Sequence, residues 1–301
     1  MEKIRNAVLT AYNAVDYPLR NLIAFQRGVP ALERNGDEVG FPRLSLQDKD
    51  QARKREKQLV EDYRIEDSFQ GCTGELYLKN LYYLDLIDQA FQKFRVALAI
   101  PLRAADIGPS HWFYVRALKQ ALTWWGTERP RKLALMGYEP DPYRIYADFY
   151  SRFDHARAHL AGISGVEYVP EAFRKQPAAF DFIGQFFPFV FLEDHLQWGL
   201  PRKYFEPARL LREVWESLSV GGYLLIVNQG EREHQEQLRL LEALSVEPLG
   251  YFAFRDFFDP LLNPWRAAFL ALAVGIAGIC SDLLESALKR LAKVKDSGHI
   301  I

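Results

Sequence analysis

Hydrophobic and polar residues are spaced at helical intervals along the first third of the chain. Apolar side chains recur every three or four positions from Ile4 to Val15, which predicts a helix that Pro18 interrupts because proline lacks a backbone N–H. Residues 48–64 predict a charged helix with a solvated face. Thr73 is placed to cap a further helix, whose apolar stripe is formed by Leu81, Leu84, Ile87, Phe91 and Phe94. We therefore expect an N-terminal helical region over residues 1–95.

From residue 96 to about 260 the pattern changes to short apolar runs that alternate with helical stretches. The predicted strands are 104–107, 133–138, 166–169, 180–185 and 223–227, and the predicted helices lie near 111–125, 142–161, 205–219 and 232–244. Strands separated by helices imply crossover connections and a parallel sheet. The predicted fold class is therefore α/β, a mostly parallel sheet with helices on both faces. Residues 249–258 could add one strand at its edge.

The last forty residues show a third pattern. Residues 267–281 are fifteen residues without a charge, and a charged segment, 282–296, follows them. As a helix the uncharged run would span roughly 22 Å, which is short of the ~30 Å hydrocarbon core of a bilayer. We expect a C-terminal apolar helix and tail over 264–301 that packs on the protein, pairs with other helices or associates with a membrane surface.

Composition narrows the class of protein. The chain has 301 residues, of which 49% are hydrophobic and 26% charged, as in soluble globular proteins. A formal net charge of −1 argues against a general nucleic-acid binder. Cys72 and Cys280 form neither a disulfide framework nor a CxxC pair, and the N-terminus lacks the apolar core of a signal peptide. We expect a cytoplasmic protein, membrane-associated if residues 267–281 reach a bilayer.

Candidate ligand-binding residues follow two of the predicted strands. Asp106 and Gly108 end the first strand, and a carboxylate beside a glycine turn is how open α/β sheets hold a nucleoside-like cofactor. Glu139 follows the second strand, and its carboxylate can accept hydrogen bonds from both hydroxyls of a ribose. A structural reading stays open, in which the aspartate caps the next helix and Gly221-Gly222 only forms a turn.

Residues 100–245 resemble class I S-adenosylmethionine-dependent methyltransferases, a family with a Rossmann-like sheet. Asp106-Ile-Gly108 is similar to the D-x-G-x-G motif of that family, and Leu218-Ser-Val-Gly221-Gly222-Tyr-Leu-Leu-Ile-Val to the L-x-P-G-G-x-L-x-I entry of its fifth strand. The resemblance implies S-adenosylmethionine as the cofactor, bound by Asp106, Gly108, Ser110, Glu139, Glu171 and Gln185. Pro109, Ser110 and His111 replace the region of the second glycine, so the cofactor loop is atypical.

The acceptor side is less defined by the sequence. The segment after Gln185 lacks the N-P-P-Y type motif of methyltransferases that act on amino groups of nucleic acids, so we expect a small or medium acceptor. His195 is the candidate base, oriented by Glu193 or Asp194, and a surface-loop histidine is the alternative. His155 and His159 lie four apart on a predicted helix, but a third ligand is missing nearby. We predict a solvated face there and no metal site.

Residues 267–301 resemble a second family, phosphatidate cytidylyltransferase (CDP-diacylglycerol synthase). The similar run extends from Ser281-Asp282 through Lys289-Arg290 to Lys295-Asp296-Ser297-Gly298. That family holds two divalent cations through several carboxylates, of which only Asp282 and Asp296 have counterparts here. We expect the fragment to be inactive, and we hypothesise that the chain joins two unrelated sequences by gene fusion or by a sequence error.

Three functions are therefore weighed. The leading one is methyl transfer from S-adenosylmethionine to a small or medium acceptor. The second is a protein related to phosphatidate cytidylyltransferase that is inactive as truncated. The third is a non-catalytic nucleoside-binding protein, which the missing second glycine favours.

Overall fold

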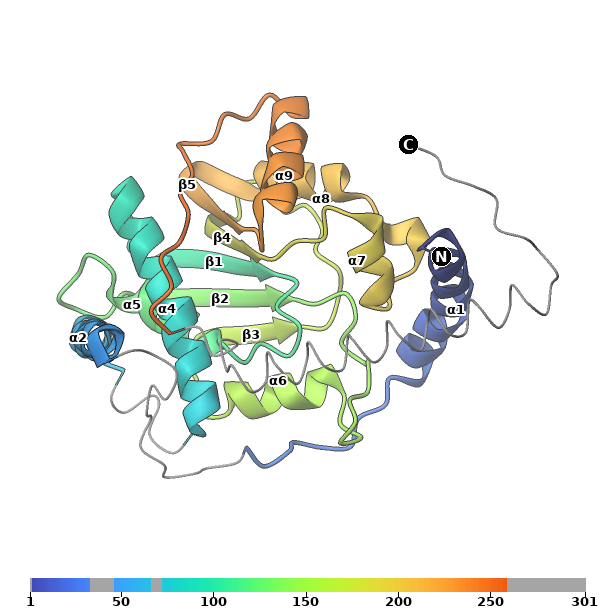
Figure 1. The fold of residues 1–301 in the computed structure, drawn as a ribbon, viewed down its shortest axis with the longest axis horizontal. Coiled ribbons are helices and arrows are strands. Elements are labelled where there is room, and N and C mark those ends of the chain that lie inside the picture. The colour runs from blue at the N-terminus through green and yellow to red at the C-terminus, as the bar shows by residue number, and fades with distance from the viewer. Residues whose placement is uncertain (1, 33–45, 66–71, 259–301) are drawn as a thin grey trace.

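A computed structural model describes residues 2–32, 46–65 and 72–258 (Figure 1). The helices are α1 (Glu2–Ile23), α2 (Leu46–Tyr63), α4 (Gly74–Phe94), α5 (Val115–Trp124), α6 (Arg152–Leu160), α7 (Leu192–Gln197), α8 (Pro207–Ser217) and α9 (Glu231–Ala243), with a short 3-10 helix η1 (Arg202–Tyr204). The strands are β1 (Leu102–Ile107), β2 (Leu133–Tyr138), β3 (Val166–Val169), β4 (Phe180–Phe186) and β5 (Leu218–Val227). The five predicted strands are confirmed, as is the existence of the helices that were predicted within the described residues.

The strands form one parallel sheet in the order β3-β2-β1-β4-β5. The order reverses between β1 and β4, because the chain first builds outward from β1 to β3 and then returns to add β4 and β5. Such a reversal opens a crevice at the carboxyl edge of the strands, where open α/β sheets bind their ligands. The α/β class is thus confirmed for the described residues.

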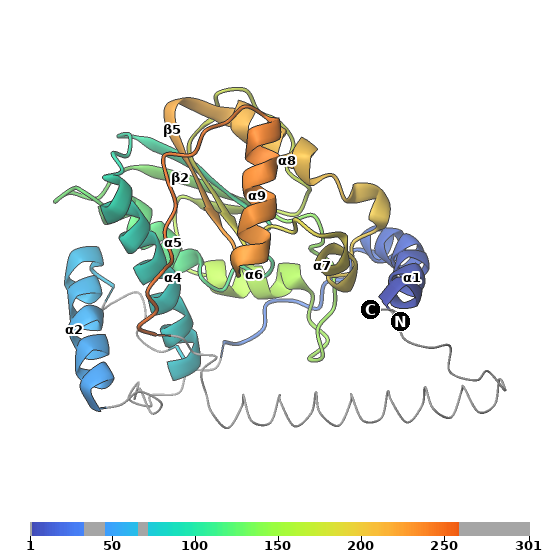
Figure 2. The same cartoon turned by 45° about the horizontal axis from the view of Figure 1, so that its top comes forward.

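Helices cover both faces of the sheet (Figures 1 and 2). On one face α4 and α5 pack over β1 and β4, with α2 outside them, and Phe91 of α4 contacts Phe182 of β4. On the other face Val214 of α8 packs against Ile183 of β4, and α9 lies beside α8. Thr73 caps α4 as predicted, since its side chain accepts a hydrogen bond from the Leu76 N–H.

The helix α1 corrects one prediction. It continues through Pro18 to Ile23, although we expected the proline to interrupt it. Contacts on both sides of the proline hold the helix in place. Before Pro18, Asn13 Nδ2 donates a hydrogen bond to the Leu196 carbonyl at 2.8 Å, and after it Arg20 forms an ion pair with Asp141. These contacts dock α1 beside α7 at the periphery of the molecule (Figure 2).

Two further predictions are wrong and one lies outside the described residues. Residues 142–151 are not helical, because Ser151 and Asp154 form a capping box that starts α6 at Arg152. Residues 249–258 contain no strand. The predicted apolar helix over 267–281 falls beyond the described residues. Among the helices that are described, none has the length and apolar character needed to cross a membrane.

Candidate functional site

The first two strands bring several predicted site residues to one edge of the sheet. Asp106 pairs with Gly137, and the Gly108 N–H donates to the Tyr138 carbonyl at 2.8 Å. Glu139 directly follows β2, so its carboxylate lies at the same carboxyl edge as the loop after β1. The sheet thus brings Asp106, Gly108 and Glu139 to the same edge, as parallel neighbours require.

A tryptophan of the loop after β1 packs against this edge of the sheet. The fully buried Trp112 donates its indole N–H to Oδ2 of Asp106 at 2.7 Å. Its ring lies so close to β2 that a Cβ on Gly137 would be 2.6 Å from Cζ3 of Trp112. Glycine at this mid-strand position therefore makes room for the indole. Sequence reasoning missed Trp112, although it stands four residues after Gly108, past the region that departs from the family motif.

The carboxylate of Glu139 is fully engaged by the protein. Oε2 accepts from the Ser110 N–H at 2.8 Å, and Oε1 accepts from the Asp141 N–H at 2.9 Å. The residue is only 1% exposed. Burial raises the pKa of Glu139, while the neighbouring Arg152 lowers it. In the described conformation Glu139 therefore ties the loop after β1 to the segment that follows β2.

Two arginines neutralise the pair of carboxylates that follows β2. Arg152 Nη1 of α6 lies 3.4 Å from Glu139 Oε1 and 3.3 Å from Asp141 Oδ2. Arg20 of α1 binds Asp141 through two bonds of 2.7 and 3.0 Å. All four side chains are buried or nearly so, and pairing is what makes buried charges tolerable. Sequence reasoning missed both arginines because their partners are distant along the chain.

Three histidines gather next to the loop after β1. His111 Nδ1 lies 3.1 Å from the Tyr146 hydroxyl, and the His111 ring lies within 6.1 Å of the rings of His155 and His159. Burial, with His159 and His155 next, lowers the pKa of His111 to about 3. Burial also lowers the pKa of His159 to about 4, so both imidazoles are neutral at neutral pH. The predicted solvated face is wrong for His159, which is 7% exposed.

The histidine cluster borders a shallow pocket. Its lining includes Lys79, His111, Phe113 and His159, and its volume is about 150 Å³. Ligand pockets for drug-sized molecules usually measure about 300–1,000 Å³. In the part of the chain that the structure describes, no group of three or more His, Cys, Asp or Glu side chains is placed to hold a metal ion.

The other predicted site residues lie apart from this network. Gln185 is buried within β4, in register with Ile226, and Glu171 is exposed in the loop after β3. His195 of α7 is buried, and its Nε2 lies 2.9 Å from the Pro201 carbonyl. Among the described residues, Glu193 makes no hydrogen bond to His195. The catalytic roles of His195 and Glu193 and the cofactor contacts of Glu171 and Gln185 stay predictions.

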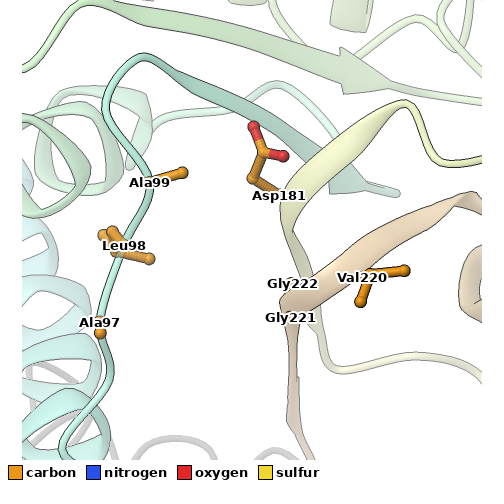
Figure 3. A pocket seen from close by; sticks show the side chains of 7 residues that line it. All are labelled: Ala97, Leu98, Ala99, Asp181, Val220, Gly221 and Gly222. Carbon is orange, nitrogen blue, oxygen red and sulfur yellow. The ribbon is translucent and has the colours of Figure 1, made fainter.

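A second pocket lies at the opposite edge of the sheet (Figure 3). It measures about 160 Å³ and lies between residues 97–99 and the Val220-Gly221-Gly222 segment, near Asp181. Gly221 has a φ of +79°, and a Cβ on Gly222 would lie 3.0 Å from the Ser219 carbonyl oxygen. The glycine pair is therefore required by the backbone at the start of β5. This edge is not the one where parallel sheets bind ligands.

The buried Asp106 predicts a pH-dependent stability. Burial raises the pKa of Asp106 to about 7, although hydrogen bonds from Tyr114 and Trp112 lower it. Between about pH 4 and pH 7 the folded protein thus holds a proton that the unfolded chain releases, so stability falls as pH rises. We expect Asp106→Asn to remove about 3 kcal/mol of this loss between pH 5 and pH 8, because about two pH units of the titration fall in that window. Urea unfolding at pH 5 and pH 8 measures it.

An exposed aspartate provides the control for this prediction. Asp62→Asn on the outer surface of α2 is expected to leave the pH dependence of the wild type unchanged. An Asp106→Asn variant whose stability falls between the two pH values as steeply as that of the wild type would contradict the assignment.

Comparisons with known proteins give two separate similarities. The Cytidylyltransferase family model matches residues 217–301, starting at the last residue of α8 and including β5 and α9. This is less than a third of the chain, and it begins well before the run over 267–301 that sequence resemblance indicated. No curated protein matches the chain.

The solved structures similar to this chain include S-adenosylmethionine-dependent methyltransferases. One from Aquifex aeolicus is 19% identical over 60% of this chain and 90% of that chain, with a TM-score of 0.36. One from Mesorhizobium loti is 20% identical over 46% and 52%, with a TM-score of 0.28. An O-methyltransferase from Thermotoga maritima is 18% identical over 52% and 49%, with a TM-score of 0.33. The resemblance of residues 100–245 to methyltransferases thus has its counterpart among these solved structures, and the resemblance at the C-terminus has its counterpart in the Cytidylyltransferase family model.

Proposed function

We propose that this protein is an S-adenosylmethionine-dependent methyltransferase that acts on a small or medium acceptor. The observation that carries the proposal is the in-register pairing of β1 with β2 in a sheet whose order reverses at β1. This arrangement gathers Asp106, Gly108 and Glu139 at the carboxyl edge, where sheets of this kind bind nucleoside ligands.

The residues at this edge fit the cofactor in their chemistry. A carboxylate such as that of Glu139 accepts hydrogen bonds from the two ribose hydroxyls. Gly108 has a φ of +76°, and no atom lies within 4 Å of the position that a Cβ would take, so the backbone is open to close approach. The bound cofactor would supply an electrophilic methyl group. Ser110 must release Glu139 before a ribose binds, so the proposal includes an opening of the loop at 108–112.

A non-catalytic protein is the second candidate, and the contacts of this loop favour it. Ser110 and Trp112 give Glu139 and Asp106 the hydrogen bonds that a cofactor or its waters would otherwise supply. Arg152 further neutralises Glu139. A protein that retained the sheet but had lost the cofactor would be stabilised by such contacts. A cytidylyltransferase-related activity has less support, since residues 259–301 of that match lie outside the described part of the chain.

Titration of the full chain with S-adenosylmethionine and S-adenosylhomocysteine by calorimetry tests the proposal. We expect the wild type to bind both, and Glu139→Gln to weaken binding at least about tenfold, because a hydrogen bond to a charged group contributes about 1.5–3 kcal/mol. Glu167→Gln, an exposed position on β3, is the matched control and is expected to bind as the wild type does. A wild-type protein that binds neither compound would reject methyl transfer and support the non-catalytic role.

A further inference from the structure

The outward face of α1 is apolar, which inverts the usual arrangement of a surface helix. Seven large apolar side chains on this face are between 50% and 81% exposed, namely Ile4, Val8, Tyr12, Val15, Leu19, Leu22 and Ile23. Their spacing places them on one stripe along the helix. We call these residues the α1 stripe. An exposed apolar surface of this extent marks a contact with a protein or a membrane.

The polar face of α1 fixes the helix to the protein. The Asn13 side chain donates to the carbonyls of Leu196 and Leu200, and the Tyr17 hydroxyl donates to the Pro140 carbonyl at 2.6 Å. Arg20 adds its bonds to Asp141 and to the Gly199 carbonyl. Because α1 is held by these polar contacts, the α1 stripe is presented outward on a fixed helix.

Basic residues border the α1 stripe. Lys3 and Arg5 are exposed in the first turn of α1. The helix η1 lies against α1 on the side of Tyr17, whose ring is 5.5 Å from that of Tyr204, and η1 carries the exposed Arg202 and Lys203 beside the face of α1 that contacts the protein. Within the described residues none of these four cations has an ion-pair partner. The covering surface therefore has to accept both an apolar stripe and unpaired positive charge.

These charges favour an anionic lipid surface over a second copy of the chain. Two copies that met through their α1 stripes would bring like charges together in either orientation. A bilayer accepts the aliphatic side chains among its acyl chains, and the flanking cations reach the lipid phosphates. Tyrosine side chains such as Tyr12 suit the boundary between the acyl chains and the lipid headgroups, because their rings are apolar and their hydroxyls are polar. We propose that α1 docks the protein in the plane of an anionic membrane, independently of any methyl transfer.

Flotation of the full chain with lipid vesicles tests the proposal. We expect binding to vesicles of phosphatidylcholine and phosphatidylserine, and weaker binding to phosphatidylcholine alone. Val15→Asp combined with Leu19→Asp is expected to reduce binding at least about tenfold, because charge on the apolar face opposes insertion. Leu249→Asp is the matched control, since Leu249 is 80% exposed outside α1. Arg202→Gln with Lys203→Gln should weaken binding to the anionic vesicles only.

Each outcome decides the proposal. All substituted residues are exposed, so unchanged thermal unfolding shows that the variants fold. If the Val15→Asp, Leu19→Asp variant binds vesicles as the wild type does, attachment occurs elsewhere, for example through residues 267–281, and the proposal is overturned. The absence of any vesicle binding also overturns it. A dimer in light scattering that this variant abolishes, without vesicle binding, would assign the stripe to a second copy instead.

Discussion

Trp112→Ala is expected to lower the free energy of unfolding by about 3–5 kcal/mol, the range typical of a buried tryptophan truncated to alanine. The indole is fully buried against Gly137, so its removal leaves a cavity on the face of the sheet next to β2. The loss also leaves Oδ2 of Asp106 without its donor. Urea unfolding followed by circular dichroism measures the change.

Two further variants separate the causes of this loss. Trp112→Phe keeps most of the ring but removes the N–H, so it isolates the cost of the unpaired Asp106 oxygen, about 1–3 kcal/mol. Trp215→Ala is the control, because Trp215 is 46% exposed, and its truncation should cost less than about 1 kcal/mol. A Trp112→Ala protein as stable as the Trp215→Ala protein would show that the contacts of the indole with Asp106 and Gly137 do not stabilise the fold.

The sheet could be predicted from the sequence because its signals are local. Short apolar runs such as 133–138 end at polar or turn residues, and each run lies within a strand, although β5 starts at Leu218, five residues before the predicted 223–227. The cap at Thr73 was equally local. The interruption predicted at Pro18 was wrong because the continuity of α1 depends on contacts between residues that are distant in the sequence. The bond from Arg20 to Asp141, which helps to hold α1 together with its proline, joins residues 121 positions apart.

The common position of Asp106 and Glu139 at one edge of the sheet could be predicted from the sequence, but the packing of that edge could not. Asp106 and Glu139 follow adjacent strands, and this order alone predicts a common edge. The closure of that edge depends on Trp112 meeting Gly137 of another strand, which no spacing in the sequence reveals. A glycine in the middle of a predicted strand was the one available signal of a close approach. Arg152 gave no signal because a helical arginine is usually exposed.

Arg152→Met is expected to cost about 3–5 kcal/mol of stability, because it leaves Glu139 and Asp141 buried with less opposite charge. Burial already raises the pKa of both carboxyls, and loss of the guanidinium raises it further. The folded variant then binds protons that the unfolded chain releases above about pH 4, so its stability falls as pH rises. The deficit relative to the wild type should be smallest near pH 5 and largest near pH 8.

A double variant tests whether the cost comes from the unpaired charge. Glu139→Gln combined with Arg152→Met should recover part of the lost stability at pH 8, because one buried carboxylate is gone. Arg157→Met on the same helix is the control, since Arg157 is exposed and its loss should change stability by less than about 0.5 kcal/mol. An Arg152→Met deficit that is equal at both pH values would mean that lost packing, including the contact with the Trp198 ring, explains it instead of charge. In that case Glu139 would not depend on Arg152, and its carboxylate would be freer to accept a ribose than the described network implies.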